Sequence, residues 1–398
     1  MVREWIGKLH LWLGLASGVV VLIVGITGCL YVFQNEITDL VSADTRFVEV
    51  PANPVRAAPS QVFAAARAAL PYDGFEHLYY TEYSDPERVI SLWAWHDETK
   101  VYQSVWIDPY TAEVTETYRF AGGFTEDFFG TVMELHTSLL LGAVGRTIVG
   151  VSTLIFVVQL ITGLVLWWPR SWRAIRPRLT IQWPGKAKRV NYDLHQVLGF
   201  YAGWVLVFIA LTGLVWAFGW VDQAVYTIAS GGAERTELPD WSETGSGTVP
   251  IPEAKATLDR VASRVRQAHP DVHSWMFEEP HDEDEPISVS LQTVEAAYGS
   301  RTLFYDGRTA EPLHDQPFSA LNRGEQLRRL NWDLHVGTLF GLPTKLLAFF
   351  ASLVAASLPV TGFLIWYPRF RKARRKAKRT ATKPAVEPSA DTPQRAAS

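Results

Sequence analysis

Charged residues are absent from four long stretches of the sequence, and charge-rich segments separate them. The stretches cover residues 9–33, 147–168, 197–220 and 346–366. At 1.5 Å per residue, a helix over each is long enough to cross about 30 Å of hydrocarbon. We therefore predict four transmembrane helices. The first exceeds the apolar core of a signal peptide and no small-residue cleavage site follows it, so we expect it to remain as an anchor.

Two segments between these stretches have the residue pattern of a small α+β fold. Each begins with a helix-like pattern, over residues 60–70 in the first segment and 252–268 in the second. Alternating apolar and polar residues follow, as in 88–96 and 286–292, with turn residues between the runs. Alternation with a period of two predicts strands that are buried on one face. We therefore predict one α+β module in each segment.

The second half of the sequence repeats the first. KLHLWLGLASGVVVLIVGITG aligns with DLHQVLGFYAGWVLVFIALTG at an offset of 185 residues, and ELHTSLLLG aligns with DLHVGTLFG at an offset of 199. VWIDPYTAEV around Asp108 matches LFYDGRTAEP around Asp306. A tandem duplication explains these matches. Each half then contains a membrane helix, an outer module, a short helix and a second membrane helix.

The predicted fold class is an α-helical membrane protein with four transmembrane helices, two outer α+β modules and short interfacial helices. The segments are transmembrane helix 1 (1–35), module 1 (36–125), a short helix with transmembrane helix 2 (126–170), a basic loop (171–190), transmembrane helix 3 (191–220), module 2 (221–322), a short helix with transmembrane helix 4 (323–368) and a basic, disordered tail (369–398).

Charge is distributed unevenly between these segments. Residues 36–127 contain 16 acidic and 6 basic residues, and residues 222–329 contain 19 acidic and 10 basic residues. Basic residues gather in the 171–190 loop and in the tail after residue 367. Short basic loops stay in the cytoplasm, so we predict cytoplasmic termini and two modules outside. We interpret the basic tail as a contact for anionic lipid of the bilayer and expect no nucleic-acid binding.

Cysteine and histidine usage narrows the chemistry. One cysteine, Cys29, excludes a disulfide framework, a Cys-rich zinc site, an iron–sulfur cluster and haem attached through C-x-x-C-H. Four of the ten histidines fall in the repeated motifs: His10, His136, His195 and His335. Ionisable groups in or near a bilayer tend to mark function, and neutral imidazole is a common axial ligand of haem iron. These four residues are therefore candidate haem ligands.

Position along the helices predicts how the histidines pair. His10 and His195 begin their helices on the basic side. His136 lies 32 residues before Trp168, about 48 Å of continuous helix, which exceeds what the bilayer needs. Glycines interrupt this stretch and its repeat, so we expect His136 and His335 on short helices at the outer surface. Pairing across the halves gives one bis-histidine b-type haem near each face, two in all.

Small and basic residues near the histidines are candidates for supporting roles. Glycine lets a flat macrocycle approach a helix, which suits the glycines that follow each histidine: Gly14, Gly142, Gly199 and Gly341. Aligned basic residues at the outer helix ends are candidates for haem propionate partners, or equally for snorkelling to headgroups: Arg146 and Lys345. A transport path for another metal is a weaker interpretation, because acidic residues are absent from the four stretches.

Other motifs receive more ordinary interpretations. We interpret the repeated Thr-Gly steps first as close contacts between helices, and second as residues that lie beside a haem edge. They are at 27–28, 162–163, 212–213 and 361–362. Two interpretations apply to four residues near the outer histidines: they pack in the local core or end helices, or they line a pocket for the electron acceptor. The residues are Phe128, Phe129, Arg329 and Trp332. We interpret His269 and His273 as surface loop residues. His281 lies in the acidic loop EEPHDEDE, which we take to be solvated, with weak divalent-cation binding as a second interpretation.

These motifs resemble the PepSY-associated transmembrane family, bacterial inner-membrane proteins that include ferric-siderophore reductases. The resemblance rests on KLHLWLGL with ITG, on DPYTAEV, which is typical of a PepSY module, on ELHTSLLLG with TGLVLWWPR, and on their second copies. It extends over residues 1 to about 375. The second copy departs from the pattern where DGR at 306–308 replaces DPY at 108–110.

The resemblance implies a haem-dependent reductase of the inner membrane, with PepSY-like modules in the periplasm. It would reduce a ferric siderophore or another periplasmic acceptor, and reduction releases Fe(II) from such hard-oxygen chelates. No G-x-G-x-x-G pattern follows a strand and no cytoplasmic segment is large enough for a flavin domain, so quinol or another protein is the expected donor. Two alternatives stay open: a non-enzymatic, protein-binding PepSY regulator, and a haem relay to a periplasmic protein.

Overall fold

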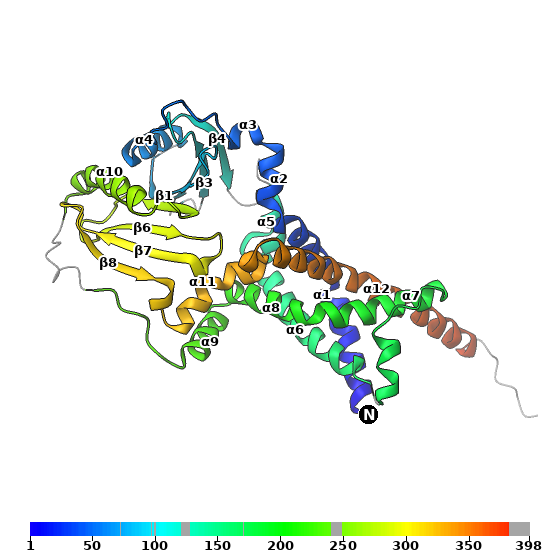
Figure 1. The fold of residues 1–398 in the computed structure, drawn as a ribbon. Coiled ribbons are helices and arrows are strands. Elements are labelled where there is room, and N and C mark those ends of the chain that lie inside the picture. Colours follow the sequence, from blue (N-terminus) through cyan, green and yellow to red (C-terminus); the bar gives the residue numbers. More distant parts are fainter. Residues whose placement is uncertain are drawn as a thin grey trace, which may run out of the picture.

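The computed structural model describes residues 1–71, 73–96, 98, 101–120, 128–169, 171–239 and 249–381. The chain forms a bundle of long helices with a β-sheet beside one end of it (Figure 1). We call the end of the bundle next to the sheet the sheet end. The opposite end, which carries the N-terminus, is the loop end.

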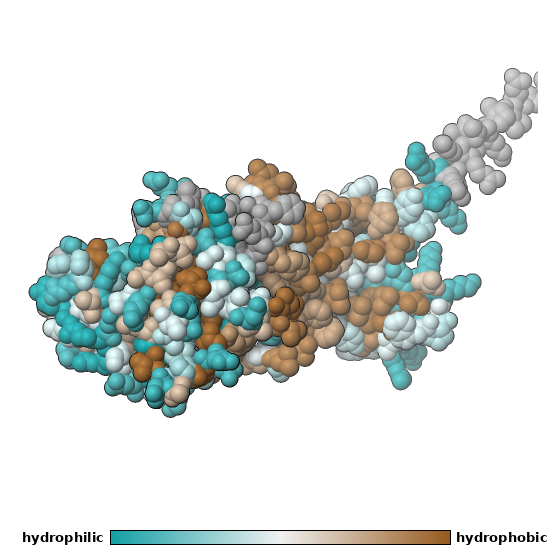
Figure 2. Space-filling model, turned by 90° about the horizontal axis from the view of Figure 1, so that it is seen from above, coloured by the Kyte–Doolittle hydropathy of each residue, from teal (hydrophilic) through white to brown (hydrophobic). Residues whose placement is uncertain are grey.

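Four long helices form the bundle, and all four are long and apolar enough to cross a membrane. They are α1 (Val2–Val32), α6 (Gly142–Trp167), the continuous helix of α7 (Ala187–Asp193), a π-helical turn (Leu194–Leu198) and α8 (Gly199–Ala217), and α12 (Leu342–Ala381). Both α1 and α8 pack against α6 and α12. Apolar side chains gather over the bundle, whereas hydrophilic ones cover much of the sheet (Figure 2). The prediction of four transmembrane helices is confirmed at the level of length and composition.

The C-terminal basic segment differs from its prediction. Residues 369–381 were expected to be disordered, but α12 continues through them to Ala381. Alanine, lysine and arginine dominate this segment and are strong helix formers, and the helix continues past Pro368 although proline removes one backbone hydrogen bond there. Residues 382–398 lie outside the described residues, and so does Arg170.

Short helices connect the bundle to the sheet. They are α2 (Gln34–Val41), α3 (Ala43–Arg46), α5 (Phe128–Ser138), α9 (Gly219–Ser230) and α11 (Arg323–Val336). A turn with positive φ at Leu139 and Leu140 separates α5 from α6, and glycines with φ of 90° at Gly337 and 66° at Gly341 separate α11 from α12. His136 and His335 therefore lie on short helices that precede the long ones, as the sequence predicts.

One antiparallel sheet of eight strands lies beyond the bundle, in the order β4-β3-β2-β1-β5-β6-β7-β8. The strands are β1 (Phe75–Tyr83), β2 (Ile90–His96), β3 (Val101–Ile107), β4 (Val114–Phe120), β5 (Ser274–Glu278), β6 (Ile287–Gln292), β7 (Ser300–Tyr305) and β8 (Pro312–Pro317). Two helices, α4 (Pro59–Ala69) and α10 (Ile251–Ala268), cover one face (Figure 1). Their apolar sides bury a single core with strand residues such as Leu92 and Val289.

The two predicted modules share this sheet rather than forming separate ones. β1 from the first half pairs with β5 from the second, and Tyr80 lies opposite Phe277 at the middle of the seam. Both side chains are fully buried, with ring centroids 5.2 Å apart. Two edge strands thereby satisfy each other's backbone hydrogen bonds. The sequence pattern predicts the strands but does not indicate the pairing that joins the halves.

The repeated DPYTAEV and DGRTAEP motifs form matching turns. Asp108 Oδ1 accepts hydrogen bonds from the backbone N–H of Tyr110 and Thr111 between β3 and β4. Asp306 Oδ1 accepts from the N–H groups of residues 308 and 309 between β7 and β8. An aspartate that caps its own turn explains why the motif needs that residue type. Replacement of Pro-Tyr by Gly-Arg leaves the turn intact.

Ion pairs cross the seam in both directions. Arg266 of α10 contacts Glu82 of β1 at 2.6 Å, and Arg67 of α4 contacts Glu279, which follows β5. Glu82 is completely buried and also lies 3.2 Å from a guanidinium nitrogen of Arg56. A buried carboxylate is tolerated when such partners compensate its lost hydration. These contacts hold each helix to the strand of the opposite half.

Candidate functional site

The structure brings the four repeated histidines together in two pairs. The ring centroids of His10 and His195 are 6.5 Å apart, and those of His136 and His335 are 6.0 Å apart. The rings of each pair are nearly perpendicular, at 84° and 77°. The predicted partners are therefore neighbours in space.

The two pairs lie at opposite ends of the bundle. His10 on α1 belongs to the loop-end pair, and Thr27 on the same helix contacts His136 of the sheet-end pair. The 17 residues between His10 and Thr27 span about 25 Å of helix. His195 and Thr212 are separated by the same number of residues along the third long helix. This distance is most of the thickness of a bilayer core.

A threonine hydroxyl lies beside Nδ1 of every histidine in the two pairs. The Nδ1–Oγ1 distances are 2.9 Å for His10 and Thr162, 3.0 Å for His136 and Thr27, 2.9 Å for His195 and Thr361, and 2.9 Å for His335 and Thr212. Each hydroxyl also donates to the backbone carbonyl four residues earlier, which uses its single hydrogen. The threonine oxygen therefore accepts the hydrogen bond from the histidine.

These contacts determine the tautomer of each ring. When Nδ1 carries the proton, Nε2 keeps its lone pair. His335 supports this assignment independently, because its Nδ1 also lies 3.0 Å from the carbonyl oxygen of Ile209, which can only accept. Burial lowers the pKa of both His136 and His335 to about 4, so these imidazoles are neutral at pH 7. All four histidines thus present Nε2 as a free metal ligand.

A glycine follows each of these threonines and faces the histidine ring. A Cβ atom added at any of the four would lie 3.3 Å from the Cε1 atom of the facing ring: Gly28 with His136, Gly163 with His10, Gly213 with His335 and Gly362 with His195. The sequence favours helix contacts as the first interpretation of the Thr-Gly steps. Their contact with the histidine rings was missed, although they repeat at the same offsets as the histidines.

The spacing within each histidine pair suits a haem iron that the two rings would hold. Metal–nitrogen bonds of about 2 Å to two imidazoles would place their ring centroids about 6 Å apart. The separations of 6.5 Å and 6.0 Å are close to that value. The threonine hydrogen bonds are the kind of contact that orients histidine ligands.

A family model described as the PepSY-associated TM region matches residues 8–369. The chain belongs to this family. The match includes most of the four long helices, both histidine pairs and the eight strands of the described residues. No curated protein matches the chain.

In this PepSY-associated transmembrane protein, the glycines predicted to pack against haem have contacts of their own. Gly14 faces the side chain of Gln159, and Gly199 faces Leu358. Gly142 and Gly341 have positive φ, at 55° and 66°, and lie where α6 and α12 begin. Such conformations favour glycine, which gives these two residues a role in the turns. Contact of any of the four with haem stays a prediction.

The two candidate propionate partners have different surroundings. Lys345 is buried and forms an ion pair with Glu36 of α2, and its ammonium lies 5.7 Å from the ring centroid of Phe33. Arg146 is exposed near the start of α6. Lys345 therefore already neutralises a protein carboxylate at the sheet end, whereas the guanidinium of Arg146 is accessible.

A cavity of about 370 Å³ lies next to the sheet-end pair. Arg329, Trp332 and Lys345 line it, together with Tyr31 at the end of α1. Of the residues proposed for an acceptor pocket, Arg329 and Trp332 are in this lining. Phe129 is instead buried with its ring centroid 6.4 Å from that of Tyr31, and Phe128 is exposed.

Aromatic rings connect this cavity with His335. The ring of Trp216 lies 5.2 Å from that of His335, Trp332 lies 6.1 Å from Trp216, and Tyr31 lies 6.2 Å from Trp332. The sequence contains these tryptophans but does not indicate their order in space. The cavity and one histidine pair are thus joined by adjacent π systems.

Proposed function

We propose that this protein is a di-haem oxidoreductase that carries electrons across the bacterial inner membrane to a ferric siderophore in the periplasm. One observation carries the proposal: four partly buried histidine rings form two pairs at opposite ends of a membrane-length bundle, and every ring has its Nε2 free. Neither a structural role nor a protein-binding role requires that arrangement at both ends.

The distribution of charge supports the orientation. The loop end carries the basic 171–190 segment and the basic end of α12, and the acidic segments form the sheet and its connections. Under the positive-inside rule, the loop end and both termini face the cytoplasm and the sheet faces the periplasm.

The chain's own residues prepare two sites for b-type haem. His10 and His195 would hold one at the cytoplasmic face, and His136 and His335 one at the periplasmic face. Bound haem supplies reversible one-electron chemistry at each site. The threonines fix the proton on Nδ1 so that both ligands of a pair stay neutral and correctly oriented.

The periplasmic cavity supplies a binding place for the acceptor. Arg329 contributes a guanidinium group, and Trp332 and Tyr31 contribute aromatic faces against which an oxygen-rich chelate could pack, while Glu295 and Asp333 in the same lining offset the positive charge. One electron reduces Fe(III) in the chelate to Fe(II), which its hard-oxygen donors hold more weakly. Oxidation of one quinol to quinone at the loop end would release two electrons and two protons, enough for two chelates.

Absorption spectroscopy of the detergent-purified protein tests the haem sites. We expect two b-type haems per chain, with His10→Ala and His195→Ala removing one and His136→Ala and His335→Ala removing the other. His273→Ala, an exposed histidine of the sheet, should keep both. A colourless wild-type protein from haem-replete cells, or loss of the same haem in His10→Ala and His136→Ala, would contradict the proposal.

Anaerobic reoxidation of the reduced protein tests the acceptor. Ferric hydroxamate and ferric catecholate chelates are added to reduced wild-type protein and to Arg329→Ala, which should retain both haems but react more slowly. If no ferric chelate reoxidises the wild type, the acceptor is a protein and the siderophore assignment is wrong.

A further inference from the structure

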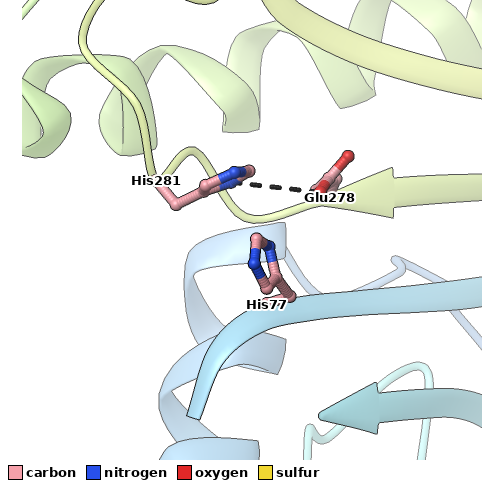
Figure 3. A group of neighbouring side chains, drawn as sticks. All are labelled: His77, Glu278 and His281. Carbon is pink, nitrogen blue, oxygen red and sulfur yellow. Dashed lines mark ion pairs between the residues drawn. The ribbon is translucent and has the colours of Figure 1, made fainter. Parts of the chain in front are cut away.

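A second cluster of metal-binding side chains lies on the sheet, distant from the histidine pairs. His77 of β1, Glu278 of β5 and His281 in the following loop point toward one another (Figure 3). His77 stands near the start of β1, whereas Arg88, which follows the other end of that strand, binds Asp39 of α2 beside the bundle. The cluster therefore lies at the end of the β1–β5 seam that faces away from the membrane helices.

The three side chains are close enough to share one ion. One potential ligand atom from each lies within 4.8 Å of the others. The ring centroids of His77 and His281 are 4.8 Å apart, and His281 Nδ1 lies 3.9 Å from Glu278 Oε1. Ligand atoms around tetrahedral zinc are about 3.4 Å apart for bonds of about 2.1 Å. Side-chain rotations that move the ligand atoms by about 1 Å would bring them from 4.8 Å to about this spacing. All three side chains are partly exposed, so they have room to move.

The surroundings favour a cation at this point. His281 Nδ1 lies 3.3 Å from the carbonyl oxygen of Glu279, so Nδ1 donates and Nε2 is the free ligand. Four acidic residues follow His281 in the loop, at 282–285, and their charge raises the local concentration of cations. They belong to the acidic loop and are not needed as ligands.

We infer that His77, Glu278 and His281 bind a divalent transition-metal ion such as Zn²⁺. Two imidazoles and one carboxylate are the ligand set of zinc sites that keep a fourth position for water. Two imidazole ligands also make the site a poor one for Mg²⁺ and Ca²⁺, because these ions prefer oxygen ligands. The inference uses none of the residues assigned to haem and stands independently of the proposed function.

A metal at this position would join the two halves of the sheet. One ligand comes from β1 and two come from β5 and its loop, on opposite sides of the seam. Binding to the folded chain therefore stabilises the β1–β5 pairing against separation.

Equilibrium dialysis of the full-length protein against ZnCl₂, with metal counted by mass spectrometry, tests the site. We expect His281→Ala, Glu278→Gln and His77→Ala each to bind one zinc ion fewer per chain than the wild type. His281 is in an exposed loop, so its variant should fold normally. His273→Ala is the matched control, because His273 lies at the opposite end of the same seam, and it should bind as much zinc as the wild type.

Thermal unfolding provides a second measurement on the same proteins. Zinc should raise the unfolding temperature of the wild type and of His273→Ala, and should leave that of His281→Ala unchanged. Equal zinc content in the wild type and all three ligand variants, or equally tight binding of Mg²⁺, would overturn the inference.

Discussion

In each histidine site, a threonine on a neighbouring helix controls which ring nitrogen carries the proton. The hydroxyl hydrogen goes to a backbone carbonyl within the threonine's own helix, which leaves the oxygen as an acceptor. The glycine next to that threonine gives the ring the space to approach. The Thr-Gly pair is therefore one unit, which orients a ligand that another segment supplies.

Replacing Thr27 by Val should weaken haem binding at the sheet end. Valine has nearly the same shape but cannot accept the hydrogen bond from His136 Nδ1, and loss of such an orienting contact typically costs about 10-fold or more in affinity. Titration of haem into the apoprotein measures this loss. Thr27→Ser keeps the hydroxyl and should bind normally, as should the loop-end site in both variants. Equal affinity of the Val and Ser variants would contradict the role assigned to Thr27.

The candidate site was predictable in part from the sequence. The four histidines repeat at fixed offsets, and their distance from the helix ends predicted which would be neighbours. Their hydrogen bonds to threonine were not predictable, because a contact between two helices has no periodic signature along either one. The same limit applies to Trp216 and Trp332, whose order relative to His335 depends on how α8 and α11 cross.

Among the elements, the two helices on the sheet are held to the strands by charge as well as by apolar packing. Arg266 reaches from α10 to Glu82 on β1, and Arg67 reaches from α4 to Glu279. Both contacts cross from one half of the sequence to the other. The sheet and its two helices are therefore expected to unfold as one cooperative unit.

Glu82→Gln should destabilise this unit. Glu82 is fully buried between Arg266 and Arg56, so the neutral side chain leaves two guanidinium groups without their counter-charge. Breaking a buried pair in this way costs about 3 kcal/mol. The midpoint of thermal unfolding, followed by tryptophan fluorescence, reports the change. Glu113→Gln, at an exposed carboxylate, serves as control, and equal midpoints for the two variants would show that the ion pairs contribute little.

Local elements were easier to predict than their connections. Period-two alternation identified strands such as 88–96. The motif around Asp108 was recognised as a repeat, whereas its role as a turn came from the structure. The pairing of β1 with β5 joins residues about 200 positions apart, and nothing in either strand specifies which edge it meets. The π-helical turn that contains His195 was also missed, because α8 is apolar on all sides and a shift by one residue leaves no trace in its pattern.

At the scale of the molecule, charge and hydropathy divide the protein along one direction. Basic residues gather at the loop end, and acidic residues outnumber basic ones in the segments that form the sheet. An apolar band covers the bundle between them (Figure 2). The proposed electron path along the bundle would follow that direction. The proposed function therefore depends on one orientation in the membrane.

Cysteine labelling tests this orientation. In a Cys29→Ser background, Ser263→Cys on exposed α10 should react with a membrane-impermeant maleimide added to spheroplasts. Ser171→Cys, in the basic loop, should react after the membrane is opened. The unsubstituted background shows the level of non-specific labelling. The reverse pattern would place the sheet in the cytoplasm and would exclude a periplasmic acceptor.

The pairing of β1 with β5 also determines how the chain could be divided. A polypeptide of residues 1–185 would expose β1 as an open edge. His10 would lack the ring that His195 provides, and His136 the ring of His335. Two copies related by a two-fold axis would repair both defects, since corresponding strands and histidines would meet. Half of this chain would therefore need a second copy of itself to complete its sheet and its histidine pairs, and would not be an independent domain.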